Sequence, residues 1–249
     1  MTVLRKYAKR LIGLAAAFTI AASQVQVSAF EPNSWAADAV KSATNLSIIS
    51  EEYSTKSFSL PISRSDFVNV AINLYATLTA ENVSTNPKNP FNDTDSPFAN
   101  MAFYTGLVSG DGEGHFFPQG TLTRQEMCKI MTSLLDSAGV LSPYFPSENV
   151  FSDVKDADEI DYWAKNHVAF MLDNHLMAGD GDTGMFRPKD PVTREEAAII
   201  AYRCYILYGK NYEGQIKTTM RDNKDSSGKT LYTLIKTIVL PSGATVALR

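Results

Sequence analysis

The stretch HLMAGDGDTGMFRPKDPVTREEA, residues 175–197, and the earlier stretch GLVSGDGEGHFFPQGTLTRQEM, residues 106–127, are two versions of one pattern. Each has a glycine-rich turn, a phenylalanine, a proline two residues after it, and then Thr-Arg-x-Glu. Self-similarity of this kind is typical of repeat proteins, in which one structural unit recurs along the chain. The chain is therefore expected to fold as a set of repeated units.

A third and more divergent copy precedes these two. Trp35-Ala36 matches Trp163-Ala164, and PISRSDF at residues 61–67 matches PVTREEA at residues 191–197, but the glycine-rich turn is missing. The predicted organisation is a first unit (31–84), a second unit (88–144), a third unit (148–210) and a tail (211–249).

Each unit is predicted to contain a helix, a loop and a second helix. In the third unit, apolar residues recur at nearly helical spacing over residues 158–176, and a second helix is expected over 194–209, ending at a glycine. A unit of this size cannot bury an apolar face alone, so the copies should pack together. The expected fold class is all-α, with linker in the tail and a small β-hairpin built from residues 230–240 and 244–249.

The first 29 residues predict a secretory signal peptide, with a basic RKYAKR, an apolar LIGLAAAFTIAA and a VSA cleavage site. The apolar run is shorter than the ~20 residues needed to cross a bilayer, which favours a signal peptide over a retained membrane anchor, and no later stretch of the chain is expected to span a membrane. Removal takes away four positive charges and no acid, which moves the net charge from -4 to -8 (-4 minus 4). Nucleic acid is therefore not an expected partner, because phosphate binding needs a basic face.

The sequence offers few residues for metal or redox chemistry. Cys128 and Cys204 lie in apolar, helix-like runs and are expected to be small buried hydrophobes, with a bridge between them left open. His115, His167 and His175 lack metal-ligand spacing, and the Asp-Gly-Asp-Thr-Gly turn lacks the twelfth-position glutamate of an EF-hand. No nucleophile elbow, P-loop or catalytic carboxylate pair is present, so neither metal, cofactor nor enzyme activity is expected.

The shared motifs resemble those of the S-layer homology (SLH) family: Phe-x-Asp-Val, Trp-Ala, Gly-x-Gly-x-Gly-x-Phe-x-Pro and Thr-Arg-x-Glu. The resemblance covers about residues 31–209 and is most complete in the third unit. It implies a pseudo-threefold prism of three helix-loop-helix units that binds secondary cell-wall polysaccharide, often pyruvylated. It also implies an exported protein that is held on a bacterial envelope and has an unknown protein cargo or assembly partner. The tail is too short to contain such a cargo as a domain of this chain.

An arginine opens the second predicted helix of each unit: Arg64, Arg124 and Arg194. A capping box explains the neighbouring threonine and glutamate but not the arginine, which at the positive end of a helix dipole costs about 0.3–1 kcal/mol. We therefore predict that free N–H groups of the first turn and the guanidinium bind a carboxylate on an anionic polysaccharide. The alternative is that each arginine pairs with a nearby acid such as Asp153 or Asp93.

Other residues are candidates for the same ligand. Trp35 and Trp163 offer flat apolar faces to a sugar ring, although a tryptophan on an amphipathic helix more often packs in the core. Gly112, Gly114 and Gly184 could expose backbone N–H groups, although such glycines more often serve to permit positive φ. The aspartate of the Phe-x-Asp-Val motif, Asp153, is also a candidate ligand-binding residue.

Two functional hypotheses follow from these observations. In the first, the chain is secreted, is retained at the bacterial cell wall or cell surface, and binds an anionic cell-wall polysaccharide without covalent attachment. In the second, it is a structural or protein-interaction module whose repeats keep the fold but have lost the ligand, which the divergent first unit permits.

Overall fold

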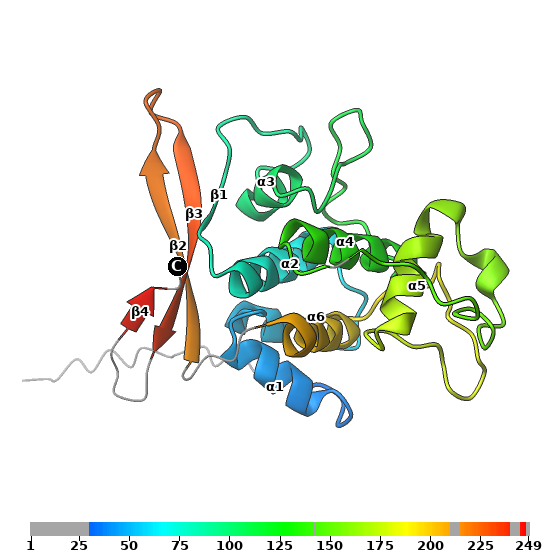
Figure 1. Cartoon of the computed structure of the whole chain (residues 1–249). Coiled ribbons are helices and arrows are strands. Elements are labelled where there is room, and N and C mark those ends of the chain that lie inside the picture. The colour runs from blue at the N-terminus through cyan, green and yellow to red at the C-terminus, as the bar shows by residue number, and fades with distance from the viewer. Residues whose placement is uncertain (1–29, 142, 210–214, 240–244, 248–249) are drawn as a thin grey trace, which may run out of the picture.

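The computed structural model describes residues 30–141, 143–209, 215–239 and 245–247, and the predicted signal peptide (residues 1–29) lies outside them. The α-helices are α1 (Ala37–Asn45), α2 (Arg64–Thr79), α3 (Pro97–Tyr104), α4 (Arg124–Ser137), α5 (Lys165–Asp173) and α6 (Arg194–Tyr208). Short 3₁₀ turns are η1 (Glu51–Thr55), η2 (Ala157–Glu159) and η3 (Tyr162–Ala164). The strands are β1 (Val83–Ser84), β2 (Gln215–Lys224), β3 (Thr230–Val239) and β4 (Thr245–Ala247) (Figure 1).

The second helix of each unit begins where the sequence predicts. In α4 and α6 the hydroxyl of the N-cap threonine accepts from the N–H of a glutamate three residues later, and that glutamate accepts from the N–H of the threonine. These capping boxes, Thr123 with Glu126 and Thr193 with Glu196, confirm the prediction. In α2, Ser63 accepts from the N–H three residues on, which is the weaker version expected for the first unit.

The first helix of the third unit is shorter than predicted. Residues 158–176 contain η2, η3 and then α5, because the backbone is extended at Ile160 and Asp161. This break places Ile160 in the core at 2% exposure and lets the Asp161 N–H donate to Gln125. The predicted C-terminal glycine of α6, Gly209, also differs, since its φ of -77° is not left-handed.

The units are joined in a closed order. The first helix of each unit packs on the second helix of another, α3 on α2, α5 on α4, and α1 on α6, and α2 also contacts α4 and α6. Just before the second helices, three fully buried residues form a ring of backbone hydrogen bonds. Ile62 donates to Val192 (2.8 Å), Val192 to Leu122 (2.9 Å), and Leu122 to Ile62 (3.2 Å). The last unit therefore closes on the first.

The tail forms a sheet beside the helices that is larger than the expected β-hairpin, so the fold is mostly α and not all-α (Figure 1). The antiparallel sheet has the order β1-β3-β2, with β4 also pairing with β3. The β3–β4 pairing confirms the expected hairpin, but residues 221–224 belong to β2 and are not linker. The polar β2 is a strand because it pairs along its whole length with β3, while Ile216 and Leu234 are buried at 2% and 1% exposure. The fold is mostly α, with a four-stranded sheet.

Both cysteines are free and fully buried, as expected of small hydrophobes. The Cys128 sulfur lies 3.4 Å from the sulfur of Met177, and burial raises the pKa of the Cys128 thiol to about 12. Within the described ranges, the helices are all too short or too polar to cross a membrane.

Candidate functional site

Each of the three predicted arginines pairs with an acid from another unit. The pairs, with their Nη1–O distances, are Arg64 with Glu126 (2.9 Å), Arg124 with Glu196 (2.9 Å) and Arg194 with Asp66 (2.5 Å). In each pair the acid is the third residue of its own helix, so one carboxylate sits at a helix start and also binds an arginine. The alternative of an internal ion pair is therefore confirmed, but with acids other than Asp153 and Asp93.

The helix starts themselves are also occupied. The backbone N–H of each arginine donates to a carbonyl of another unit: Arg64 to Gly120 (2.9 Å), Arg124 to Asp190 (3.0 Å) and Arg194 to Leu60 (2.9 Å). The next N–H in each helix does the same, to Pro118, Pro188 and Phe58. The prediction that free first-turn N–H groups await an anion is therefore wrong. Carbonyl oxygens and a carboxylate supply the negative charge that the dipole and the guanidinium require.

The arginines differ in how much of the guanidinium remains available. Arg124 is 6% exposed, and its Nε and Nη2 donate to the carbonyls of Phe186 (2.8 Å) and Ala178 (3.0 Å). The Arg64 side chain is 21% exposed, and its Nε donates to Phe116 (3.1 Å). Among the described residues Nη2 of Arg64 has no hydrogen-bond acceptor, so this arginine keeps a donor for a ligand.

A groove of about 350 Å³ lies beside Arg64 and is lined by Glu126, Lys129, Gly110 and Trp163. Trp163 is 46% exposed, and the Lys129 ammonium lies 5.9 Å from the centre of its ring. The charged lining sums to +1, two cations minus one carboxylate. The groove thus combines a net positive charge with an open aromatic face, which suits an anionic sugar.

A second groove, of about 180 Å³, lies beside Arg124 and repeats this arrangement with Trp35, which is 62% exposed. Its charged lining, Arg124, Arg187, Arg203, Asp180 and Glu196, also sums to +1 (three minus two). Trp35 comes from the first unit, Arg124 from the second and Glu196 from the third. Each groove therefore depends on all three units being folded together.

Two residues before each tryptophan, a side chain is hydrogen-bonded to the second residue of a helix in another unit. Asp161 exchanges hydrogen bonds with Gln125 (2.7 and 3.1 Å), and Asn33 donates to Glu195 from its amide and its backbone (2.7 and 3.1 Å). Gln125 and Glu195 occupy the same position in α4 and α6. Because both tryptophans are exposed, the alternative that they pack in the core is wrong.

The third groove, beside Arg194, differs from the other two. It encloses about 100 Å³ and has no tryptophan, and Lys56, Arg194, Glu52 and Asp66 sum to zero charge (two minus two). The Arg194 guanidinium is 2% exposed and lies 3.9 Å from the centre of the Tyr53 ring. Burial alone would raise the pKa of Asp66, but the hydrogen bond from Lys56 and the charge of Arg194 outweigh burial and lower it.

The predicted glycines serve the backbone. Gly112, Gly114 and Gly184 have φ of 87°, 90° and 73°, values that side-chain-bearing residues rarely adopt. The glycines that line the grooves are instead Gly110 and Gly179.

The side chain of Asp153 is exposed, and a neighbouring aspartate makes the backbone contacts in the third unit. Asp93 accepts hydrogen bonds from the N–H groups of residues 116–117 (2.9 and 2.8 Å). In the third unit it is Asp156 that accepts from residues 186–187 (2.7 Å each), while Asp153 is exposed. Asp156, three residues after Asp153, is therefore the structural counterpart of Asp93. A role for Asp153 in ligand binding stays a prediction.

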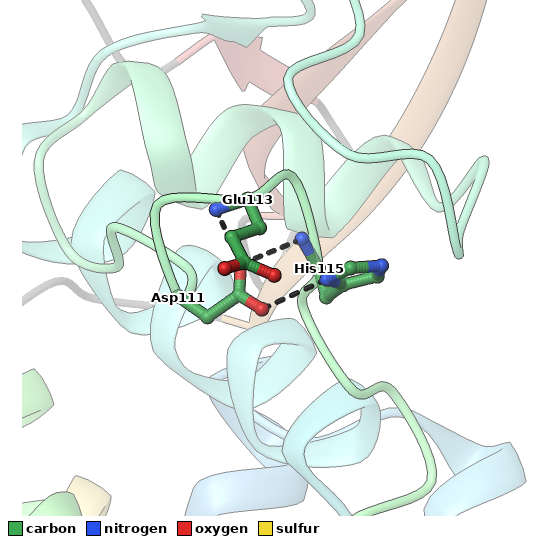
Figure 2. A group of neighbouring side chains, drawn as sticks. All are labelled: Asp111, Glu113 and His115. Atoms are coloured by element: carbon green, nitrogen blue, oxygen red, sulfur yellow. Dashed lines mark hydrogen bonds and ion pairs between the residues drawn. The ribbon is translucent and has the colours of Figure 1, made fainter.

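One cluster in the second unit has metal-ligating residue types: Asp111, Glu113 and His115 (Figure 2). Asp111 Oδ1 accepts from the N–H groups of Glu113 (2.8 Å) and His115 (3.0 Å), and Oδ2 lies 2.8 Å from His115 Nδ1. The hydrogen bonds from His115 and Glu113 lower the pKa of Asp111 to about 2. These contacts close the glycine-rich turn and account for the cluster without an ion.

Comparison with known proteins places two segments in a family. The S-layer homology domain matches residues 92–128 and 155–198, in the second and third units.

Three similar proteins illustrate where such segments occur. An amylopullulanase of Thermoanaerobacterium thermosulfurigenes is 32% identical over 49% of this chain and 6% of its own length. A cellulosome-anchoring protein of Acetivibrio thermocellus is 31% identical over 47% of this chain and 25% of its own. A surface-layer 125 kDa protein of Lysinibacillus sphaericus is 30% identical over 42% of this chain and 8% of its own. This chain thus spans a quarter or less of each of these relatives.

Proposed function

We propose that this chain, which carries S-layer homology domains, is an exported module that holds itself on a bacterial cell envelope by binding an anionic, pyruvylated cell-wall polysaccharide. The proposal includes no catalytic step. The names of two relatives, a cellulosome-anchoring protein and a surface-layer protein, support a cell-surface setting. The first unit, 31–84, is taken as a third and divergent domain of the same kind. The closed ring of hydrogen bonds between the units supports a pseudo-threefold prism.

The observation that carries the proposal is the pair of equivalent grooves beside Arg64 and Arg124. Each has a net charge of +1 and an exposed tryptophan in a chain whose overall charge is negative. The two grooves are positive although the chain as a whole is negative, and two similar positive grooves suit a polymer whose anionic group repeats. The Arg64 groove is the better site, because it is larger and its arginine keeps a free donor.

The roles of the groove residues follow from their contacts. Arg64 is already held by Glu126 and contributes its Nη2 donor, while Lys129 adds a cation that forms no ion pair with any acid in the part of the chain that the structure describes. Trp163 offers its ring to the apolar face of a sugar. Arg124 and Arg194 are mainly structural, since they are buried and saturated with acceptors or nearly so.

The test is cosedimentation of the purified protein with purified cell-wall sacculi. Lys129→Gln and Trp163→Ala should each weaken binding about tenfold, the size of one lost charge-assisted hydrogen bond or stacking contact. The matched controls are Lys165→Gln and Tyr162→Ala, which alter an exposed lysine and an exposed aromatic on the same segment but outside the grooves. The controls should bind like the parent protein.

Chemical removal of pyruvate from the sacculi tests the ligand itself. Binding should fall to the level of the Lys129→Gln variant, because the carboxylate is the group that the groove cations attract. If the two groove variants bind as well as their controls, the anchoring proposal is wrong.

The second candidate function is a structural or interaction module that has lost the glycan. It is favoured by one observation, that all three arginines are used in ion pairs between units. It predicts no cosedimentation with sacculi by the folded parent protein, and it is excluded by binding that the groove variants reduce.

A further inference from the structure

A further cavity among the described residues belongs to none of the grooves with tryptophan. It has a volume of about 960 Å³ and lies between the helices and the tail sheet, where Ser47 and Asn73 face Phe98, Thr218 and Tyr232. It adjoins the small Arg194 groove, with which it shares residues 49–50, Glu52 and Asn69. The tail therefore extends the third groove into a cavity of the size that ordinary small ligands occupy.

One side chain in this cavity lacks a partner that it needs. Asn73 is 4% exposed, and its Nδ2 donates to Asn69 Oδ1 at 2.8 Å, but its own Oδ1 has no hydrogen-bond donor. A buried acceptor without a donor is costly, so such atoms are rare unless something else binds them. Asn73 lines the cavity, so a ligand hydroxyl or N–H group would satisfy this oxygen once the amide turns toward the cavity.

The charges of this cavity are opposite to those of the other two grooves. Glu51, Glu52 and Asp95 face only Lys217, which gives a net charge of -2 (one minus three). At each of two α2 positions that line the cavity, one of the other two second helices carries a cation, while the remaining helix has Ser133 or Ile199 there. Asn69 lies five residues after the first residue of its helix, where α4 has Lys129, and Asn73 lies nine residues after, where α6 has Arg203. An anionic ligand is repelled here.

The rest of the lining suits a polyol. The hydroxyl oxygen of Thr218 can accept a hydrogen bond from a ligand, the amide nitrogen of Asn69 can donate one, and the rings of Phe98 and Tyr232 supply apolar area. Polar groups that fix orientation, set among aromatic faces, are typical of small-ligand sites. The mixture has few places for a charged group and many for hydroxyls.

We propose that this cavity binds an uncharged, hydroxyl-rich sugar residue. It is a second class of ligand site, distinct from the anionic grooves in its lining, its charge and its dependence on the tail sheet. The proposal goes beyond the function proposed above and does not require it, because no residue of the Arg64 or Arg124 groove takes part.

The experiment is a titration of the purified protein, followed by NMR of backbone and asparagine side-chain amides. The probes are the methyl glycosides of glucose, mannose, galactose and N-acetylglucosamine, and as an anionic match the methyl glycoside of glucuronic acid. At least one neutral glycoside should shift the signals of α2 and β2 at millimolar concentration. The glucuronide should bind at least about fivefold more weakly than the glucoside or not at all, because of the acidic lining.

Variants locate the site. Asn73→Leu should weaken the neutral sugar about tenfold while leaving the melting temperature unchanged or higher, because the unpartnered oxygen is removed. Tyr232→Ala, on an exposed position of β3, gives a second measure if Asn73→Leu folds poorly. The matched control is Asn166→Leu, an exposed asparagine outside every groove, which should bind like the parent protein.

The outcomes separate this proposal from the anchoring function. Lys129→Gln should lose binding to sacculi and keep the neutral sugar, whereas Asn73→Leu should do the reverse. The proposal is overturned if none of the four neutral glycosides shifts these signals, if Asn73→Leu and Tyr232→Ala bind them like the parent protein, or if the glucuronide binds as tightly as the glucoside.

Discussion

Arg124→Ala should unfold the protein more easily, although its residue type suggests ligand binding. The guanidinium is 6% exposed and donates to Glu196 and to the carbonyls of Phe186 and Ala178. Removing one partner of a buried ion pair costs about 3–5 kcal/mol. Glu196 keeps 26% of its side-chain surface exposed, so its carboxylate recovers some hydration and the lower end, about 3 kcal/mol, is expected. In a domain of this size that loss lowers the melting temperature by about 6–12 °C.

The free energy of unfolding is measured by urea denaturation and the melting temperature by calorimetry. The control is Arg221→Ala, an exposed arginine of β2, which should change stability by less than about 0.5 kcal/mol. Arg124→Lys should lose an intermediate amount, since a lysine keeps the charge but not the planar fork of donors. A loss below about 1 kcal/mol for Arg124→Ala would refute the structural role of this arginine.

Three further outcomes are expected. The pKa of Asp66 is lowered in the fold, so the stability that its carboxylate contributes is complete above its ordinary pKa and is lost as the pH falls through the lowered value. The urea midpoint, measured from pH 5 to pH 2, should therefore fall less for Asp66→Asn than for the parent protein. Gly110→Ala should destabilise the protein by about 1–3 kcal/mol more than Gly112→Ala in the same assay, because a Cβ at Gly110 would lie 2.8 Å from a ring carbon and 2.9 Å from a carbonyl, whereas one at Gly112 meets nothing within 4 Å. Cys128 and Cys204 should react with a thiol reagent only after unfolding, and a fast reaction of the native protein would contradict their burial.

The sequence determined the local features whose causes lie within a few residues. The capping threonines Thr123 and Thr193 and the helices that follow are local, because a side chain three residues away satisfies the first N–H groups. The repetition of the motifs also indicated that the units pack together, since identical apolar faces need a partner. These predictions needed no knowledge of which unit touches which.

The tertiary structure decided what each of these residues does. Arg64 and its counterparts were expected to face a ligand, but each is held by an acid from another unit. Arg64 and Glu126, for example, are more than sixty positions apart in the chain. Lys129 gave no signal in the sequence, and it becomes a groove residue only because Trp163 of the next unit lies beside it. Likewise, residues 221–224 of β2 were expected to be linker and are a strand because β3 pairs with them. Capping depends on near neighbours in the chain, whereas charge pairing, groove lining and sheet pairing depend on neighbours that folding brings together.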